Sequence, residues 1–251
     1  MSSPTVAVFR PDDERATRAA KLLESLGANP VVDPMLAVEP TGEIARSDAE
    51  YVILTSVTGV DLVADTGWDP GDATVCAIGD RTADALDEAG YPVGIVPDEF
   101  TSAGLVDALA SEVDGRRVEV ARSDHGSDVL TDGLDDAGAY VHETVLYRLV
   151  RPPEAGRSAE LAAAGDLDAA LFTSSLTVKH FLDAAADRGV RAAAVDGLDD
   201  AVVGTIGEPT RETAEELGVA VDLVAPTETF EALANGAIDA IRTKGTADGG
   251  A

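Results

Sequence analysis

The chain has 251 residues, of which 47 are acidic and 18 basic, giving a formal net charge of −29 at pH 7. A chain this acidic lacks the basic footprint that nucleic acids and anionic membrane surfaces require, so both classes of partner are excluded. Its 45% hydrophobic content is nevertheless enough to bury one large core or two smaller ones. Only three basic residues are lysines, and acidic residues occur along the whole chain, which is typical of adaptation to a salty, charge-screening cytoplasm.

Short β-branched runs alternate with stretches rich in alanine, leucine and glutamate. This alternation indicates parallel sheets with helices on both faces, since strands buried on both sides show no polar alternation. The predicted strands are residues 6–9, 51–54, 73–77, 93–96, 117–121, 169–172, 201–205 and 219–224. The predicted helices between them include residues 14–26, 81–89 and 209–217.

No signal-like N-terminus and no apolar run long enough to span a membrane is found, so we expect a soluble, cytoplasmic protein. Cys76 lies in an apolar run and is expected to be a buried strand cysteine. The three histidines lack metal-ligand spacing, and no phosphate loop, dinucleotide fingerprint or nucleophile elbow occurs. No metal and no cofactor are therefore expected.

The chain contains an internal repeat. Ile78-Gly79-Asp80-Arg81-Thr82 recurs 128 residues later as Ile206-Gly207-Glu208-Pro209-Thr210, and Thr55-Ser56 recurs 118 residues later as Thr173-Ser174. The change of offset predicts a connection that is ten residues longer in the second copy, near residues 187–200. A weaker pair relates residues 6–10 to residues 118–122. Two copies of one α/β unit explain these matches.

The two copies are out of phase with the chain ends, which predicts that the chain leaves the first lobe early and returns late. We therefore expect two parallel-sheet, flavodoxin-like lobes joined by a two-stranded antiparallel hinge. Lobe one would comprise residues 1–33 and 152–243, lobe two residues 41–139, and the hinge residues 34–40 and 140–151. Residues 244–251 are predicted to form a disordered tail.

The repeated Ile-Gly-x-x-Thr motif predicts a turn from a strand into a helix. Its glycine permits a tight turn or the close approach of a ligand, and the unpaired N–H groups of a helix start bind anions. Ordinary helix capping by Thr82 and Thr210 explains the motif equally well, and the same alternative holds for the two Thr-Ser turns. If the motifs bind a ligand, we expect the four turns to face one shared small-molecule cleft.

Six arginines could pair with an anionic ligand, and Arg10 is favoured among them because it directly follows the first strand. The others are Arg81, Arg122, Arg148, Arg151 and Arg211. Tyr147, in the second hinge segment, could donate its phenolic proton to a leaving group. A strand tyrosine that packs on one face with its hydroxyl in water is an equally good interpretation.

The ordered set of motifs resembles the uroporphyrinogen-III synthase family from residue 5 to about residue 241. Arg10-Pro11 is similar to that family's opening Arg-Pro, the two Thr-Ser and two Gly-x-x-Thr turns follow in order, and Tyr147 stands where the second linker carries a tyrosine. The chain departs from the family where Val57 and Ser175 replace a frequent proline and where Arg211 replaces a frequent alanine.

The resemblance implies a cofactor-free enzyme that closes the linear tetrapyrrole hydroxymethylbilane to uroporphyrinogen III, with inversion of ring D and loss of water. Its product leads to haem, sirohaem and cobalamin. A single proton donor would assist the loss of water, and Tyr147 is our hypothesis for that donor. The resemblance implies as substrate-binding residues Arg10, Thr55, Ser56, Gly79, Thr82, Thr173, Ser174, Gly207 and Thr210. We expect Thr82 and Thr210 mainly to shape the helix starts. The family likeness favours a monomer and allows transient contact with hydroxymethylbilane synthase.

Two other classes of function remain open. A non-enzymatic cytosolic sensor or binding protein with two lobes would share the hinge, the twin lobes and the helix-start donors. Such a sensor normally carries a regulatory module, and no segment is left for one after both lobes are counted. A nucleotide-dependent transferase is disfavoured because the chain has no phosphate loop.

Overall fold

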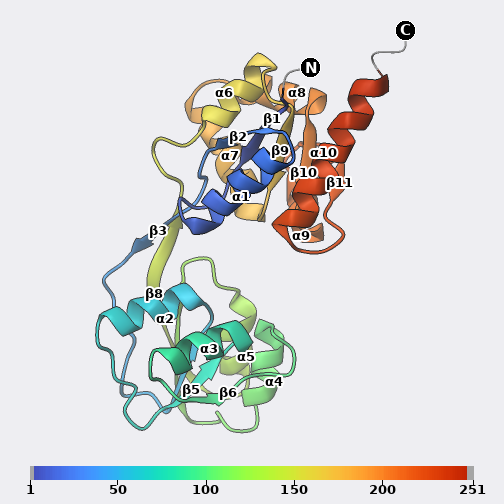
Figure 1. Cartoon of the computed structure of the whole chain (residues 1–251). Coiled ribbons are helices and arrows are strands. Elements are labelled where there is room, and N and C mark those ends of the chain that lie inside the picture. Colours follow the sequence, from blue (N-terminus) through green and yellow to red (C-terminus); the bar gives the residue numbers. More distant parts are fainter. Residues whose placement is uncertain (1–2, 248–251) are drawn as a thin grey trace. The chain divides into compact units, whose positions relative to one another are not determined.

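A computed structural model describes residues 3–247 of the chain. Within them the chain divides into two compact units, coloured by sequence in Figure 1. The first unit takes the residues up to Ala37 and those from Val150 onward, and the second is Val38–Leu149. Among residues 3–247, no helix combines the length and apolar character needed to cross a membrane.

The first unit is built on a five-stranded parallel sheet with the strand order β11-β10-β9-β1-β2. Its elements in chain order are β1 (Thr5–Val8), α1 (Glu14–Ser25), β2 (Asn29–Val32), α6 (Arg157–Ala164), β9 (Ala169–Phe172), α7 (Ser175–Asp187), α8 (Arg191–Asp200), β10 (Val202–Thr205), α9 (Glu208–Glu216), β11 (Leu223–Val224) and α10 (Phe230–Ala247).

The second unit is built on a six-stranded sheet with the order β3-β8-β7-β4-β5-β6. The strands from β8 to β6 run parallel to one another. Its elements are β3 (Ala37–Pro40), β4 (Tyr51–Leu54), α2 (Val57–Asp65), β5 (Thr74–Ala77), α3 (Asp80–Glu88), β6 (Val93–Ile95), α4 (Ser102–Leu109), β7 (Arg117–Ser123), α5 (Asp128–Asp136) and β8 (Tyr140–Val150).

The two sheets share one strand order, which confirms the predicted duplication. Strands β6-β5-β4-β7-β8 of the second unit take the positions of β11-β10-β9-β1-β2 in the first. The three motif pairs seen in the sequence fall on these equivalent strands. The longer connection of the second copy is the additional helix α8, which packs against α6 and lies where the change of offset predicted it.

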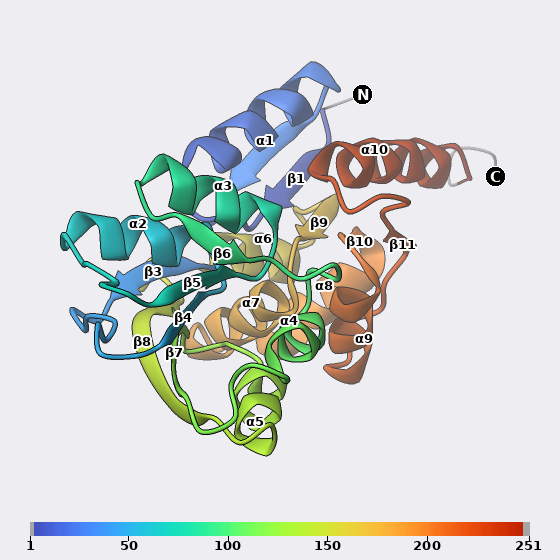
Figure 2. The same ribbon diagram turned by 90° about the horizontal axis from the view of Figure 1, so that it is seen from below.

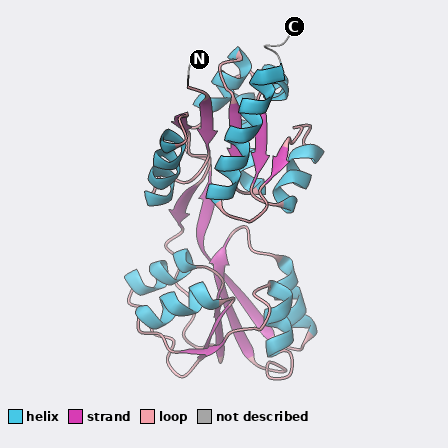
Figure 3. Ribbon diagram, turned by 45° about the vertical axis from the view of Figure 1, so that its right-hand side comes forward, coloured by secondary structure: helices cyan, strands magenta, loops and turns pink. Residues whose placement is uncertain are grey.

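Each sheet is covered by helices on both faces, as Figures 2 and 3 show. Val6 and Val8 of β1 pack with α1 and α10, while Ala7 of β1 and Phe9 directly after it pack with α6 to α9 on the opposite face. The second sheet divides its side chains in the same way between α2 with α3 and α4 with α5. Strands buried on both faces explain why these runs are apolar without alternation.

Three details differ from the sequence-based expectations. The edge strand β11 is only Leu223–Val224, shorter than the predicted 219–224, because only these two residues pair with β10. Residues 140–149 belong to the second unit because β8 pairs with β7 along nearly its whole length, from Tyr140 beside Arg117 to Tyr147 beside Ser123. The antiparallel pairing of the two crossing segments stays a prediction.

The third difference concerns the tail predicted from Lys244. Helix α10 continues to Ala247, and the Lys244 ammonium donates hydrogen bonds to the backbone carbonyls of Asp200 and Ala201, at 3.3 and 3.0 Å. A cation near a helix C-terminus is also favoured by the helix dipole. Residues 248–251 of the predicted tail lie outside the described residues.

Cys76 is fully buried in the centre of β5, as predicted. Burial raises the pKa of its thiol to about 12, so the thiol stays protonated at neutral pH.

Asp33, directly after β2, holds the start of α6 although it lies far away in the sequence. Its carboxylate is 4% exposed and accepts hydrogen bonds from the amides of Gly156, at 2.9 Å, and Ser158, at 2.8 Å, and from the Ser158 hydroxyl. Gly156, the N-cap of α6, supplies no side-chain cap and takes a φ of 118°, a conformation that favours glycine. Asp33 therefore caps α6 in place of a local side chain.

We predict that Asp33→Ala lowers the free energy of unfolding of the first unit by about 2–3 kcal/mol, because it leaves buried donors without an acceptor. Denaturant unfolding followed by circular dichroism measures this loss, and the amides of Gly156 and Ser158 should exchange hydrogen faster. Asp239→Ala is the matched control, since that carboxylate forms only an exposed ion pair with Arg242. Equal stability of the two variants would contradict the capping role.

Candidate functional site

Nine of the ten predicted site residues lie just beyond the carboxyl ends of parallel strands. Arg10 follows β1, the two Thr-Ser pairs follow β4 and β9, and the two Gly-x-x-Thr turns follow β5 and β10. Because parallel strands end at the same edge of a sheet, each unit gathers its own set at one edge. The expectation that both sets serve one ligand stays a prediction.

The two Thr-Ser turns have nearly the same conformation. Ser56 has φ −157° and ψ 150°, and Ser174 has φ −165° and ψ 157°. Each serine is an N-cap whose hydroxyl accepts from an amide, that of Gly59 at 3.0 Å or that of Thr177 at 3.3 Å. The serines therefore cap helices. Within residues 3–247, the hydroxyls of Thr55 and Thr173 have no hydrogen-bond partner and are free to meet a ligand.

The two Gly-x-x-Thr turns are also alike, and they correct the capping interpretation of their threonines. Gly79 and Gly207 are the N-caps of α3 and α9, both in extended backbone, and no side chain accepts a bond there. Thr82 and Thr210 are instead the third residues of their helices and are buried. Their amides donate to the carbonyls of Gly79 and Gly207, at 3.0 and 3.2 Å.

A side chain from elsewhere in the same unit lies close to the glycine of each turn. A Cβ on Gly79 would lie 3.0 Å from the Phe100 ring, and one on Gly207 would lie 3.1 Å from the Glu228 carboxylate. The glycines thus let another side chain approach the helix start. Phe100 and Glu228 were missed in the sequence, although the 128-residue offset of the repeat aligns them.

The two helix starts offer different numbers of donors. In the described part of the chain, the amides of Asp80 and Arg81 at the start of α3 have no acceptor. The second residue of α9 is Pro209, which has no N–H group, so α9 offers only the Glu208 amide. Arg81 lines a hollow at the start of α3 together with Phe100. The second unit therefore presents the stronger anion site of the two turns.

Tyr147 and Ser56, two residues predicted independently, meet in the second unit. The Tyr147 ring is 6% exposed and packs in the core with Leu54 and Ala121, and its hydroxyl lies 3.0 Å from the Ser56 hydroxyl. Tyr147 thus belongs to a strand of the second sheet. Its hydroxyl reaches the carboxyl edge of that sheet and bonds to Ser56, where the alternative interpretation had placed it in water.

The loop after β7 holds the backbone around Tyr147. The Asp124 amide donates to the Tyr147 carbonyl at 3.2 Å, and the Asp124 carboxylate accepts from the Leu149 amide at 3.0 Å. Burial would raise the pKa of Asp124, but hydrogen bonds from His125 and Leu149 outweigh it and lower the pKa. An ionised Asp124 therefore keeps its acceptor role at neutral pH.

The six candidate arginines fall into two groups. Arg122, Arg151 and Arg211 form ion pairs with carboxylates of the chain. For Arg10, Arg81 and Arg148, no carboxylate partner is found in residues 3–247. A carboxylate ligand would meet the least competition from the chain at the second group.

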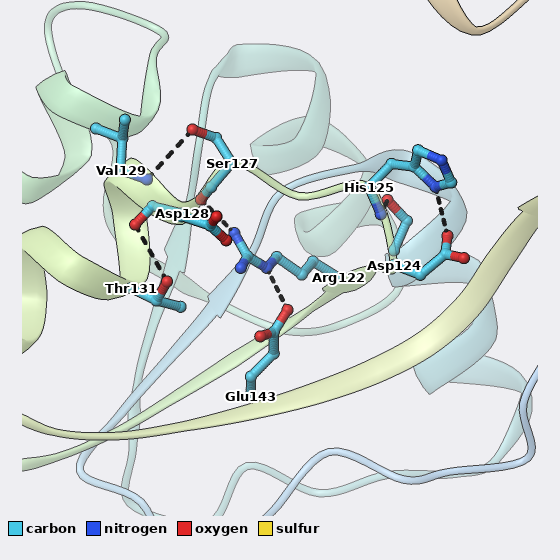
Figure 4. A network of polar contacts seen from close by, with 9 residues as sticks. Arg122, Asp124, His125, Ser127, Asp128, Val129, Thr131 and Glu143 are labelled. Atoms are coloured by element: carbon cyan, nitrogen blue, oxygen red, sulfur yellow. Dashed lines mark hydrogen bonds and ion pairs between the residues drawn. The ribbon is translucent and has the colours of Figure 1, made fainter. Parts of the chain in front are cut away.

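Arg122 has a structural role (Figure 4). Its guanidinium is buried and donates to Glu143 at 2.6 Å and to the Ser127 carbonyl at 2.6 Å. A Cβ at Gly126 would lie 2.3 Å from the Arg122 side chain, so that loop closes over it.

Comparison with known proteins gives one consistent result. A model of the family described as uroporphyrinogen-III synthase HemD matches residues 17–235. A Methanothermobacter thermautotrophicus protein named "Putative uroporphyrinogen-III synthase" is 34% identical over 230 residues, covering 85% of this chain and 90% of the relative. Uroporphyrinogen-III synthase of Synechococcus elongatus is 27% identical over 247 residues, covering 91% and 92%.

The fold is shared with a solved structure. A mutant uroporphyrinogen III synthase of Thermus thermophilus superposes with a TM-score of 0.66 at 22% identity, covering 96% of this chain and 100% of that one. The family match, the curated relatives and the twin parallel sheets agree, and the chain belongs to the uroporphyrinogen-III synthase family.

Proposed function

We propose that the chain cyclises hydroxymethylbilane to uroporphyrinogen III through a proton donated by Tyr147, with inversion of ring D and loss of water. Membership of the family supports the overall reaction. The observation that supports the role of Tyr147 is its hydrogen bond to Ser56 at the carboxyl edge of the second sheet.

The substrate carries many carboxylates, and the two sheet edges offer groups that bind carboxylates. The free amides at the start of α3 and the unpaired Arg81 suit an anion in the second unit. The free hydroxyls of Thr55 and Thr173 add donors next to the capping serines. Most of the rate enhancement would come from holding the bilane in a conformation in which ring D inverts before the ends close.

The hydrogen bonds around Ser56 suit Tyr147 to donate a proton. Because the Ser56 oxygen already accepts from the Gly59 amide, the serine can turn its own proton toward the Tyr147 oxygen. The phenolic proton of Tyr147 is then directed at the departing hydroxyl, which leaves as water. The Ser56 hydrogen bond stabilises the charge that develops on the phenol oxygen.

The remaining steps restore the donor. After water leaves, the substituted carbon of ring D attacks the cation that remains, and a spiro intermediate forms. This intermediate fragments, and the ring then closes again with ring D inverted. The ring carbon loses a proton when aromaticity returns, and this proton balances the one that Tyr147 supplied. No cofactor takes part in this scheme.

Incubating the protein with enzymatically generated hydroxymethylbilane and separating the isomers tests the overall reaction. We expect uroporphyrinogen III in excess over the uninverted isomer I that the free bilane forms unaided. A product mixture containing only isomer I above background would overturn the proposal. Tight binding of the bilane without turnover would instead favour the non-enzymatic binding protein.

We predict that Tyr147→Phe lowers kcat for isomer III by about 10²- to 10⁴-fold, since it removes the proton donor and keeps the ring in the core. Kinetics with enzymatically generated hydroxymethylbilane measure this change in the rate of isomer III formation. Tyr140→Phe is the matched control, because Tyr140 lies on the same strand but is 70% exposed. Full turnover by the Tyr147 variant would exclude it as the donor.

The net charge of −29 opposes the approach of a polyanionic substrate, and salt weakens that repulsion. We therefore predict that kcat/KM rises with potassium chloride up to about molar concentration, where the Debye length is about 3 Å. Trp68 fluorescence and circular dichroism would show that the fold persists across the series. A fall in kcat/KM without unfolding would contradict adaptation to a salty cytoplasm.

A cytoplasmic location, a monomeric state and transient contact with hydroxymethylbilane synthase stay predictions of this proposal.

A further inference from the structure

Arg10 and Arg122 occupy equivalent positions in the repeat but have different surroundings. Arg10 follows β1 just as Arg122 lies at the end of β7, and β1 and β7 are equivalent strands. Arg122 is paired with Glu143, as described above. Arg10 has no carboxylate partner among the described residues, and its Nε is buried without a hydrogen-bond acceptor.

The strand registers explain why Arg10 lacks a counterion. In the second unit Glu143 lies beside Val120 on the neighbouring strand, two residues before Arg122. In the first unit the corresponding neighbour of Val8, two residues before Arg10, is Val32. An apolar residue therefore stands where the other copy places its carboxylate. The first unit therefore has the arginine of the repeat without a carboxylate on the neighbouring strand.

The Arg10 guanidinium is held in place by other groups. Its carbon lies 4.9 Å from the centre of the Phe230 ring, a cation–π contact with the first residue of α10. Arg15 and Arg18, one turn apart on α1, line the same cavity as Arg10 and Phe230. Burial, together with repulsion from Arg15 and Arg18, lowers the pKa of Arg10.

Acidic groups also lie near this cavity, but none of them forms an ion pair with Arg10. Asp13 pairs with Arg15, and Glu14 pairs with Arg18 at 3.2 Å, both on side chains that are largely exposed. Glu231 lines the cavity as well but forms no ion pair with Arg10. Of the three arginines of the cavity, only Arg10 lacks a carboxylate partner within residues 3–247.

We propose that Arg10, Arg15, Arg18 and Phe230 form a carboxylate-binding pocket at the carboxyl edge of the first sheet, and that its ligand is an acidic side arm of the substrate. The identity of the ligand rests on the proposed function. The carboxylate takes the place that Glu143 fills in the second unit and accepts a hydrogen bond from the buried Nε of Arg10. Arg15 and Arg18 add charge at the cavity mouth.

Two variants of opposite design test the pocket at one potassium chloride concentration. Arg10→Gln removes the cation, and Val32→Glu supplies the internal carboxylate that the repeat lacks here, so that it competes with the ligand. Both should raise KM for hydroxymethylbilane, and Kd for the stable polycarboxylate uroporphyrin III, by about 10-fold while kcat changes by less than about twofold. Arg18→Gln should raise both constants by only about two- to threefold, because Arg18 is exposed.

One control removes the same charge at another position, and the other adds similar bulk at the same position without charge. Arg191→Gln changes an exposed residue at the start of α8, on the opposite face of the first sheet, and should leave KM and Kd unchanged. Val32→Gln should also match the parent chain, since it adds a side chain of similar size without charge. Circular dichroism confirms folding, and Val32→Glu keeps the test decisive if Arg10→Gln fails to fold.

The outcomes separate the pocket from the proposed function. If the parent chain makes isomer III but KM and Kd of both variants equal those of the controls, the pocket is excluded and the enzyme activity stands. A loss of kcat with unchanged KM and Kd would overturn the binding role as well. If the parent makes no isomer III, the proposed function fails, and weakened uroporphyrin binding by Arg10→Gln still supports a carboxylate pocket.

Discussion

Every predicted binding group depends on one local constraint, the passage from the end of a buried parallel strand into the first turn of a helix. The strand is packed on both faces, and the helix that follows it begins with N–H groups that lack intrahelical acceptors. Ser56 and Ser174 satisfy one such group each, whereas Gly79 and Gly207 leave theirs open. Binding capacity therefore arises from how the helices start.

The duplication gives two such edges, and local differences make them unequal. At the start of α3, Arg81 and an exposed Phe100 surround open amides. The equivalent places in the first unit hold Pro209, which lacks an N–H group, and Glu228, which is anionic. The first unit compensates at β1, where Arg10 has no internal counterion while its equivalent Arg122 is neutralised by Glu143. Each copy thus has its own strongest anion-binding position.

Charge acts on two length scales in this chain. The overall charge of −29 sets a repulsive field that salt screens, whereas a cation at a sheet edge acts over a few ångströms. Arg122, Arg151 and Arg211 form ion pairs, so a ligand would compete there with carboxylates of the chain. The few arginines without a carboxylate partner thereby gain importance, because they determine where an acidic ligand can be held.

The sequence alone determined the duplication, the parallel sheets and the order of the motifs, because these follow from short-range patterns: buried strands, glycine at helix starts and matched offsets. It could also single out Tyr147 and Ser56, but only as separate candidates. Their hydrogen bond depends on β8 lying beside β7, with Tyr147 next to Ser123, a register that no local pattern specifies.

The same limit applies to the capping roles and the arginines. Thr82 and Thr210 have the residue type of a cap, but the caps are the glycines before them. Lys244 lies in a polar stretch that resembles a tail, yet carbonyls from a distant turn hold it. Which arginine is neutralised depends on strand neighbours, Glu143 in one unit and Val32 in the other. Sequence determines which groups the edges carry, and only tertiary contacts decide which remain free, because their partners come from distant parts of the chain.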